Sequence, residues 1–539
     1  MQSSEWRLLL MATVVIAAGC SDDDASVVQE SPDRPNVIFI MADDHAYQAI
    51  SAYGSELIDT PNIDRLADEG LLFDRAYVGN SICSPSRATL LTGKFSHANG
   101  LRDNVGIFDG SQLTLQGLMQ QAGYQTAIVG KWHLKSEPTG FDYWDVLPDQ
   151  GEYYNPIFVS ADGERTEEGY VTDITTDLAV DWLSNERDDS RPFLLFYHHK
   201  APHREWWPPL ENPDEFHSWE IPEPETLFDD YAGRGSAAEE AEMRISIHMG
   251  LTNDNKITPE NAAAMGHEPF MGWYDDAWRR QYDEYMNDEQ RAALDAIYGP
   301  INDEFVAMNL EGDELTRWKY QRYMQDYLAT IRSIDDNIGR MLAHLEESGL
   351  LDDTLIVYTS DQGFYLGEHG WFDKRFIYEE SFRTPLLMRI PGLESDGESR
   401  SALVQNVDFA PTILDLAGAA IPDDMHGQSL KPLFEGDDPD FRDAAYYHYY
   451  EYPSIHAVKR HYGIRTDRYK LVHFYYDVDE WELYDLQSDP MELTSVYDDP
   501  AYSDVREEMT ALLYEVQARY GDSPELAQQI LEADLARME

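Results

Sequence analysis

The sequence predicts an α/β protein with a large, mostly parallel sheet flanked by helices and a smaller C-terminal antiparallel sheet plus helix. Short, continuous apolar runs, which are typical of buried parallel strands, alternate with segments of helical periodicity. Alternation of this kind favours a parallel sheet with helices on both faces. Beyond about residue 402 the pattern changes to short aromatic segments separated by turns, which indicates a second, antiparallel sheet.

Four of the apolar runs end abruptly in polar, ionisable residues. These predicted strands cover residues 35–42, 125–129, 192–197 and 354–359. The predicted helices cover residues 61–69, 114–122, 172–184 and about 314–347. Ligands of open α/β sheets bind in the crevice beyond the carboxyl ends of the strands, so four polar strand ends predict a functional site there.

Two further regions divide the chain. Residues from about 212 to 300 are rich in Glu, Asp, Met and Trp and interrupt the alternation, which indicates an insertion at the mouth of the crevice. This insertion is either a substrate lid or a solvated helical excursion. We expect a catalytic domain over residues 34–401 and a smaller C-terminal subdomain over residues 402–539. In that subdomain, strands are predicted at residues 446–452, 462–466, 469–476 and 481–485, with a helix at residues 505–520.

The N-terminal segment has the features of an export signal. Arg7 precedes an apolar run at residues 8–18, which is too short for a transmembrane helix. Small residues follow and end at Cys20, a pattern that resembles a bacterial lipoprotein signal; plain secretion is the alternative. We therefore expect a signal peptide over residues 1–19 and a polar tether over residues 20–33. The exported protein would be anchored through lipid on Cys20 to a bacterial membrane, facing the periplasm or the cell surface.

Charge and cysteine content limit the possible partners and cross-links. The chain has 102 Asp and Glu residues against 40 Lys and Arg residues, a net charge of −62. Nucleic-acid-binding proteins need a basic surface, so this class is excluded. The two cysteines are Cys20 and Cys83. If Cys20 carries lipid, Cys83 is the only remaining thiol and the mature protein has no disulfide to form.

Carboxylates and an amide follow two of the predicted strands. Asp43 and Asp44 come directly after the first strand, and Asp361 and Gln362 come after the last. Adjacent buried carboxylates repel each other unless a cation lies between them. Oxygen ligands of this kind suit Ca²⁺ or Mg²⁺ rather than zinc. Helix capping would explain either pair alone, but the two pairs together favour a metal site.

Basic clusters follow the same strand ends. Lys131 and His133 come after the second strand, residues 198–204 contain three histidines, a lysine and an arginine, and Lys374 and Arg375 come after Asp361. In a chain this acidic, local positive clusters fit an anionic, tetrahedral substrate group whose charge must be met in the transition state.

Cys83 opens the stretch Cys-Ser-Pro-Ser-Arg, which ends at Arg87 and is followed at residues 90–93 by Leu-Leu-Thr-Gly. A plain thiolate nucleophile would need a His partner and an oxyanion hole, and it leaves the carboxylates unexplained. The Cys-x-Pro-x-Arg pattern, with the polar clusters in this order, resembles formylglycine-dependent (type I) sulfatases of the alkaline phosphatase superfamily. The resemblance runs from residue 35 to about residue 492 and implies an alkaline-phosphatase-like fold.

The resemblance implies a modified nucleophile and a bound cation. A formylglycine-generating or sulfatase-maturating enzyme would convert Cys83 to formylglycine, whose hydrate is the nucleophile. One Ca²⁺ would be held by residue 83 together with Asp43, Asp44, Asp361 and Gln362. The family usually has Asn or His in place of Gln362. Glutamine keeps the carbonyl ligand but adds a methylene, so the metal geometry stays open.

The remaining catalytic roles also follow from the resemblance. Arg87 would stabilise the charged formylglycine, and Lys131 and Lys374 would contact sulfate oxygens. His133 would bind the hydrate. His203 would protonate the leaving alcohol, with His198 as the competing candidate.

The stretch from Asp361 to Lys374 resembles a branch that acts on glycan 6-sulfates, such as N-acetylglucosamine-6-O-sulfate. We expect a sulfatase that releases inorganic sulfate from a sulfated polysaccharide or oligosaccharide. The alternatives are a phosphonate monoester or phosphodiester hydrolase with the same formylglycine site, and a catalytically inactive glycan-binding lipoprotein. Residues that would contact the sugar, or only pack or lie at the surface, are His369, Arg375, Tyr154 and His461, with His456 near the last of these.

Overall fold

The structure, a computed structural model, describes residues 34–538 except residues 212, 213, 394, 396 and 439. The predicted signal peptide, the tether and Cys20 lie outside the described residues. Among the helices that are described, none combines the length and the apolar character needed to span a bilayer.

The largest element is a ten-stranded sheet. Its five central strands are parallel to one another. On one side of them, β13 is antiparallel to β9; on the other side, β6 is antiparallel to β5, and β7 is antiparallel to β6. In spatial order the strands are β14 (Glu398–Arg400), β2 (Leu71–Phe73), β13 (Leu386–Arg389), β9 (Thr354–Ser360), β1 (Asn36–Ala42), β8 (Phe193–His198), β4 (Gln125–Lys131), β5 (Tyr143–Leu147), β6 (Ile157–Ser160) and β7 (Gly163–Thr166).

The four predicted strands are confirmed, and they are neighbours in the order β9, β1, β8 and β4. In the register of this parallel group, Ala42 lies beside Ser360 and Met41 beside His198. Gly130 pairs with the same His198. The carboxyl ends of all four strands therefore meet at one edge of the sheet, which brings their polar continuations together.

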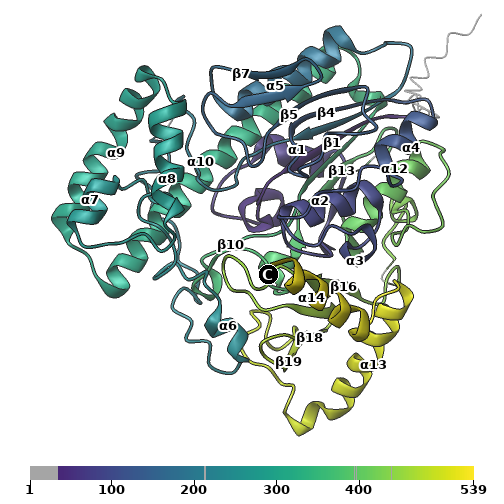
Figure 1. The fold of residues 1–539 in the computed structure, drawn as a ribbon. Coiled ribbons are helices and arrows are strands. Elements are labelled where there is room, and N and C mark those ends of the chain that lie inside the picture. Colours follow the sequence, from purple (N-terminus) through teal and green to yellow (C-terminus); the bar gives the residue numbers. More distant parts are fainter. Residues whose placement is uncertain (1–33, 212–213, 394, 396, 439, 539) are drawn as a thin grey trace, which may run out of the picture. The chain divides into compact units, whose positions relative to one another are not determined.

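Helices cover both faces of the sheet (Figure 1). Side chains of β1 alternate between two cores, because Ile38 and Ile40 face one cluster while Val37 and Phe39 face the other. The first core includes residues of α1 (Pro61–Asp68), α5 (Val171–Asp181) and α10 (Gly312–Glu347), and the second those of α2 (Cys83–Thr92), α4 (Leu115–Gln121) and α12 (Phe409–Leu416). The predicted helices are thus confirmed, although α5 continues as a π-helical turn at Trp182–Glu186.

The predicted C-terminal antiparallel sheet is also present. Its strands are β16 (Ala445–Tyr449), β17 (His461–Arg465), β18 (Tyr469–Phe474) and β19 (Glu480–Asp485), paired in chain order. Helix α13 (Ser503–Arg519) joins the core of this sheet through Met509, Leu513 and Val516. A second helix, α14 (Pro524–Met538), was not predicted; it buries Ala527, Ile530 and Leu531. The described residues form one compact unit, and the division at residue 402 stays a prediction.

Where the structure describes it, the segment around residues 212–300 consists of short helices joined by turns and loops. It contains α6 (Ser236–Glu240), α7 (Pro259–Ala264) and α8 (Trp273–Arg279), and it leads into α9 (Asp288–Met308). The remaining short elements are α3 (Ser96–Asn99), α11 (Glu379–Phe382), the pair β10 (Tyr365–Leu366) and β11 (Phe372–Asp373), and a small sheet of β12 (Arg383–Thr384), β3 (Ala76–Tyr77) and β15 (Val404–Gln405).

Helix α1 is capped by a residue of another helix. Its N-cap residue, Thr60, makes no side-chain cap bond. Instead, the carboxylate of Asp335 on α10 accepts hydrogen bonds from the backbone N–H groups of Asn62 (3.0 Å) and Ile63 (2.9 Å). This contact supplies acceptors for two of the helix donors that have no partner within the helix, and it joins α1 to α10.

We predict that Asp335→Ala lowers the free energy of unfolding by about 1–3 kcal/mol, because two backbone donors lose their acceptor. Urea denaturation followed by circular dichroism measures the change. Asp335→Asn keeps an acceptor oxygen and serves as the matched control, with an expected smaller loss. Equal midpoints for the alanine variant and the unchanged protein would contradict this role of Asp335.

Candidate active site

Three carboxylates meet where β1 and β9 end. Oxygens of Asp43, Asp44 and Asp361 lie within 4.8 Å of one another, and all three side chains are buried. The backbone N–H of Asp44 donates to Oδ1 of Asp361 at 3.2 Å, which ties the two strand ends together. Asp44 has φ of 70°, a sparsely populated backbone conformation for a non-glycine residue. The chain thus holds these like charges in a strained turn, as functional sites often do.

The oxygen donors of this group fit a hard divalent cation. Within the described part of the chain, Oε1 of Gln362 accepts no hydrogen bond, and the carboxylate of Asp43 has cationic groups, Lys131 and Arg87, as its neighbours. Gln362 instead donates its amide Nε2 to Oδ1 of Asp361 at 2.8 Å and to Asp44. Burial raises the pKa of Asp44, so its charged form needs compensation. A set of carboxylate and amide oxygens is the environment that Ca²⁺ prefers.

Each carboxylate also has a buried cationic partner. Lys131 forms an ion pair with Asp43, and the ammonium of Lys374 donates to both oxygens of Asp44, at 2.7 and 2.6 Å. Arg87 contacts Oδ2 of Asp361 through Nε at 3.1 Å and Nη2 at 3.0 Å. The predicted metal ligands and the predicted anion-binding cations are therefore brought into one site.

The position of Lys131 depends on a glycine. Gly130 has φ of 97°, and a Cβ built there would lie 1.9 Å from the backbone oxygen of His198 on the adjacent strand. Only glycine allows β4 and β8 to stay paired at this point. The end of β4 can therefore deliver Lys131 to the sheet edge.

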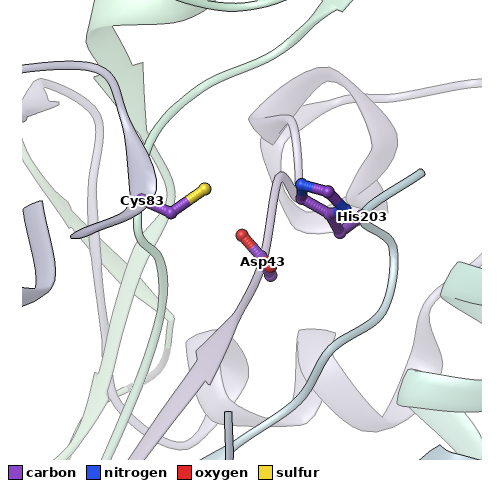
Figure 2. A group of neighbouring side chains, drawn as sticks. All are labelled: Asp43, Cys83 and His203. Atoms are coloured by element: carbon purple, nitrogen blue, oxygen red, sulfur yellow. The ribbon is translucent and has the colours of Figure 1, made fainter. Parts of the chain in front are cut away.

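Cys83 is the first residue of α2, and all ten residues of this helix are buried. Figure 2 shows the sulfur of Cys83 and the ring of His203 on either side of the Asp43 carboxylate, and atoms of these three residues lie within 4.8 Å of one another. Burial raises the pKa of the Cys83 thiol to about 12. An unmodified thiol is therefore protonated at neutral pH and a poor nucleophile here. The N-terminus of α2, where Cys83 lies, would stabilise a negatively charged group at this position.

Side chains from distant segments fix the turn at Cys83. The hydroxyl of Ser84 donates to the carbonyl of His133 at 2.6 Å, and its backbone N–H donates to Oδ1 of Asn104 at 3.0 Å. Ser86 accepts a hydrogen bond from Nδ2 of Asn406 at 3.0 Å. Sequence reasoning missed both asparagines, because neither belongs to a motif and both are far from residue 83 along the chain.

The two competing histidines lie in different surroundings. His203 has Nε2 3.8 Å from Oδ2 of Asp44, and its Nδ1 donates to the carbonyl of Arg204 at 2.6 Å. His198, the last residue of β8, lies 3.4 Å from the guanidinium of Arg87 and stacks on Phe196. His203 therefore faces the carboxylates and Cys83, whereas His198 packs behind them.

His133 lies beside the Cys83 turn. Its side chain is buried, and Nε2 is 3.4 Å from the carboxylate of Asp149. Burial, together with the neighbouring Lys131 charge, lowers the pKa of His133 to about 3. The imidazole is therefore neutral and available for hydrogen bonding at neutral pH.

Three of the predicted sugar contacts are buried in the structure. Tyr154 is in the main core and donates its hydroxyl to the carbonyl of Pro208. His461 lies among aromatic rings, with Nδ1 on the carbonyl of Lys459 at 2.8 Å. His369 is fully buried and contacts Asp229, Arg234 and Glu380. Against the effect of burial, its carboxylate neighbours raise the pKa of His369 to about 9. The Tyr154 hydroxyl and Nδ1 of His461 are thus hydrogen-bonded within the protein, whereas Nε2 of His369 lies 3.5 Å from Glu380 without a hydrogen bond in the described part of the chain. The sugar-contact role of these residues stays a prediction.

Arg375 is the predicted sugar contact that adjoins the site. It pairs with Asp373, and its Nε is 3.5 Å from Glu451. His456 contacts the same Asp373 at 3.3 Å. Both Asp373 (φ 79°) and Arg375 (φ 99°) have strained backbone conformations on either side of Lys374, which reaches Asp44. One short turn therefore joins the carboxylate group to a second polar cluster of Asp373, Arg375, Glu451 and His456.

Comparison with known proteins assigns the family. The sulfatase family profile matches residues 35–419, and the profile of the C-terminal region of N-sulphoglucosamine sulphohydrolase matches residues 367–519. The chain is 49% identical over 531 residues to an N-acetylglucosamine-6-O-sulfatase of Bacteroides thetaiotaomicron, covering 97% of this chain and 92% of that protein. It is 26% identical over 431 residues to the human N-acetylglucosamine-6-sulfatase, covering 75% of this chain and 65% of that protein.

Solved structures agree with these sequence matches. A protein solved in complex with its substrate D-glucosamine-2-N,6-O-disulfate matches with a TM-score of 0.87 and 50% identity, covering 91% of this chain and 99% of that one. A phosphonate monoester hydrolase of Agrobacterium radiobacter shares the fold, with a TM-score of 0.65 and 24% identity over 90% of this chain and 96% of that one. Because the sulfatase profile covers most of the chain and a named sulfatase is nearly half identical over almost its whole length, the chain belongs to the sulfatase family and is a sulfuric ester hydrolase.

Proposed function

We propose that this sulfatase hydrolyses 6-O-sulfate esters of glucosamine residues in a sulfated glycan and releases inorganic sulfate. The observation that carries the proposal is the convergence of Cys83, three carboxylates and three cations in one buried site. The substrate class is supported by the relative named as an N-acetylglucosamine-6-O-sulfatase and by the similar protein solved with a glucosamine disulfate.

Two groups would complete the site. Asp43, Asp44, Asp361 and Gln362, with residue 83, would hold one Ca²⁺, which supplies a Lewis acid that polarises bound oxygens. Formylglycine made from Cys83 supplies, as its hydrate, the nucleophilic hydroxyl. The fit is supported by the three buried carboxylates, by Oε1 of Gln362, which accepts no hydrogen bond in the described part of the chain, and by the position of the Cys83 sulfur beside Asp43.

The protein's own cations would bind the sulfate group. Lys131 and Lys374 each pair with a predicted metal ligand, Asp43 and Asp44. A divalent cation would take over much of the charge compensation of these carboxylates. The two ammonium groups would then face the sulfate oxygens at the point where negative charge grows in the transition state. Arg87, held on Asp361, would stabilise residue 83 in its charged form.

His203 would protonate the leaving sugar oxygen. A carbonyl oxygen can only accept, so the 2.6 Å contact with Arg204 fixes the proton on Nδ1. Nε2, which faces the Asp44 side of the site, would therefore carry the transferable proton in the imidazolium form of the ring. Burial and the neighbouring Lys131, Lys374 and Lys200 lower the pKa of His203. The negative charge of the bound sulfate ester would have to offset these effects for the ring to be protonated. Proton donation of this kind typically contributes about 10²–10⁴ to the rate.

Maturation and export are part of the same proposal. A formylglycine-generating or sulfatase-maturating enzyme must reach Cys83 and its neighbours, yet every residue of α2 is buried in the fold. Modification would therefore precede the packing of α2. We also propose that the chain is exported and anchored by lipid on Cys20, as the sequence pattern predicts.

We predict that protein matured in its host carries an aldehyde at residue 83, and that Cys83→Ser lowers the hydrolysis of N-acetylglucosamine-6-sulfate by about 10³-fold or more. Mass spectrometry of the peptide and ion chromatography of released sulfate measure the two effects. Cys20→Ser is the matched control and should retain hydrolysis. Full activity of Cys83→Ser would contradict the mechanism, and faster cleavage of a phosphodiester than of the sulfate ester would contradict the substrate class.

Gln362 tests the metal site. We predict that Gln362→Ala weakens Ca²⁺ binding by about 10–100-fold or more, because a ligand carbonyl is lost. Gln362→Asn keeps a carbonyl and should bind more tightly than the alanine variant. Isothermal titration of chelator-treated, matured protein gives the affinities. Gln116→Ala, which removes another buried glutamine on α4, should bind Ca²⁺ normally. Unchanged affinity in Gln362→Ala would contradict the assignment.

Arg375 tests sugar recognition. We predict that Arg375→Ala raises KM for N-acetylglucosamine-6-sulfate by about 10-fold or more, since hydrogen bonds to charged groups contribute about 1.5–3 kcal/mol. Steady-state kinetics measure the change. Arg234→Ala is the control, because it also removes a buried, ion-paired arginine but one that contacts Asp229 and His369 instead. A similar KM in the Arg375 variant and the unchanged enzyme would remove Arg375 from the sugar site.

A further inference from the structure

Three successive backbone carbonyls around His203 are each held by a side chain. The hydroxyl of Tyr153 donates to the carbonyl of His203 at 2.6 Å. The carbonyl of Arg204 accepts from the His203 ring, and the ammonium of Lys256 donates to the carbonyl of Glu205. The backbone that carries the predicted proton donor is therefore fixed from several sides.

The strongest of the neighbouring contacts is an ion pair between Arg204 and Asp254. The guanidinium Nη2 lies 2.6 Å from both carboxylate oxygens, and Nε lies 3.0 Å from Oδ1. Arg204 is 8% exposed and Asp254 is fully buried. The guanidinium also lies 5.0 Å from the ring centre of Tyr274 and 5.1 Å from that of Phe372. Two side chains are thus held in one geometry with little freedom.

Asp254 and Lys256 both belong to the predicted insertion, in the loop between α6 and α7. This loop is anchored on α10, since Lys319 donates to the carbonyl of Met249 at 2.9 Å and Asn255 donates to the carbonyl of Lys319 at 3.1 Å. The backbone N–H of Gly250 donates to Asp254 at 2.7 Å. A long core helix therefore supports the carboxylate that holds Arg204.

Stability alone is a weak reason for such a pair. Replacing a buried ion pair by apolar residues is often neutral or stabilising, because desolvation offsets the attraction. The position of this ion pair next to His203 suggests a role in orienting the His203 ring. Arg204 supplies the carbonyl that orients the His203 ring, so a shift of Arg204 would turn Nε2 away from the site. Displacements of about 1 Å can cost about 10²-fold in rate.

We infer that Asp254 positions His203 for proton transfer by holding Arg204. The insertion is then a support for the catalytic histidine, contributed by a loop remote in sequence. Asp254 itself is a positioning residue, since it contacts Arg204 and not the reacting atoms. The inference rests on the proposed role of His203 as the proton donor.

A double-mutant cycle tests it. We expect Asp254→Asn to lower kcat for N-acetylglucosamine-6-sulfate by about 10–100-fold with KM changed less than about 2-fold. In a His203→Ala background, the same substitution should change kcat by less than about 2-fold, because its effect passes through the missing ring. Arg204→Lys keeps the positive charge but loses the planar guanidinium that binds both carboxylate oxygens, so it should change kcat in the same way. It replaces Asp254→Asn in the test if the Asp254→Asn variant does not fold.

Asp408→Asn is the matched control. Asp408 forms a buried, two-pronged pair with Arg442, at 2.7 Å for each contact. Any effect of Asp408→Asn on kcat should be equal in the unchanged protein and in the His203→Ala variant. An Asp254→Asn effect that is equally large with and without His203 would contradict the inference, as would no effect at all. If His203→Ala leaves kcat unchanged, the proposed proton donor is wrong; this outcome is distinct from failure of the positioning role.

Discussion

The site depends on three buried carboxylates that the sheet brings together. Asp43, Asp44 and Asp361 lie within 4.8 Å of one another in a buried environment, where like charges repel strongly. Such a group persists only if opposite charges are supplied. Lysine and arginine side chains from α2, from the end of β4 and from the turn after β11 supply them. The same requirement creates a place for a divalent cation and, beside it, a place for an anionic substrate group.

The parallel sheet explains why these groups meet. Neighbouring parallel strands end at one edge, so residues that follow β1, β4, β8 and β9 become neighbours although they are tens to hundreds of residues apart along the chain. The sequence predicted this part well, because buried parallel strands leave long apolar runs whose ends are visible. The polar residues that follow each run could be read directly, so their meeting at the sheet edge was predictable. The pairing of each carboxylate with its own cation depends on the register of the strands and on the geometry of the turns after them. The sequence pattern does not show either of these.

Polar residue types that pack inside the protein are ambiguous in a sequence. Tyr154 and His461 have side chains that often bind sugars, but here their polar atoms contact backbone carbonyls in the core. A sequence shows the residue type and not the partner, so a satisfied core histidine and a ligand-binding one look alike. Arg375 differs because it adjoins Lys374, whose place in the site is fixed by Asp44. The contact of Asp254 with Arg204 was equally invisible, since it joins an insertion loop to a strand end.

The proposed site can be tested by a crystal structure of the matured protein with Ca²⁺ and N-acetylglucosamine-6-sulfate, made with a slow variant such as His203→Ala. We expect one Ca²⁺ on Asp43, Asp44, Asp361 and Gln362, with the ester sulfur about 3–3.5 Å from the oxygen on residue 83. The bridging ester oxygen should face the space that the His203 ring fills in the unchanged protein. A sulfate group bound away from residue 83, or a bridging oxygen turned toward Arg87, would contradict the proposed site.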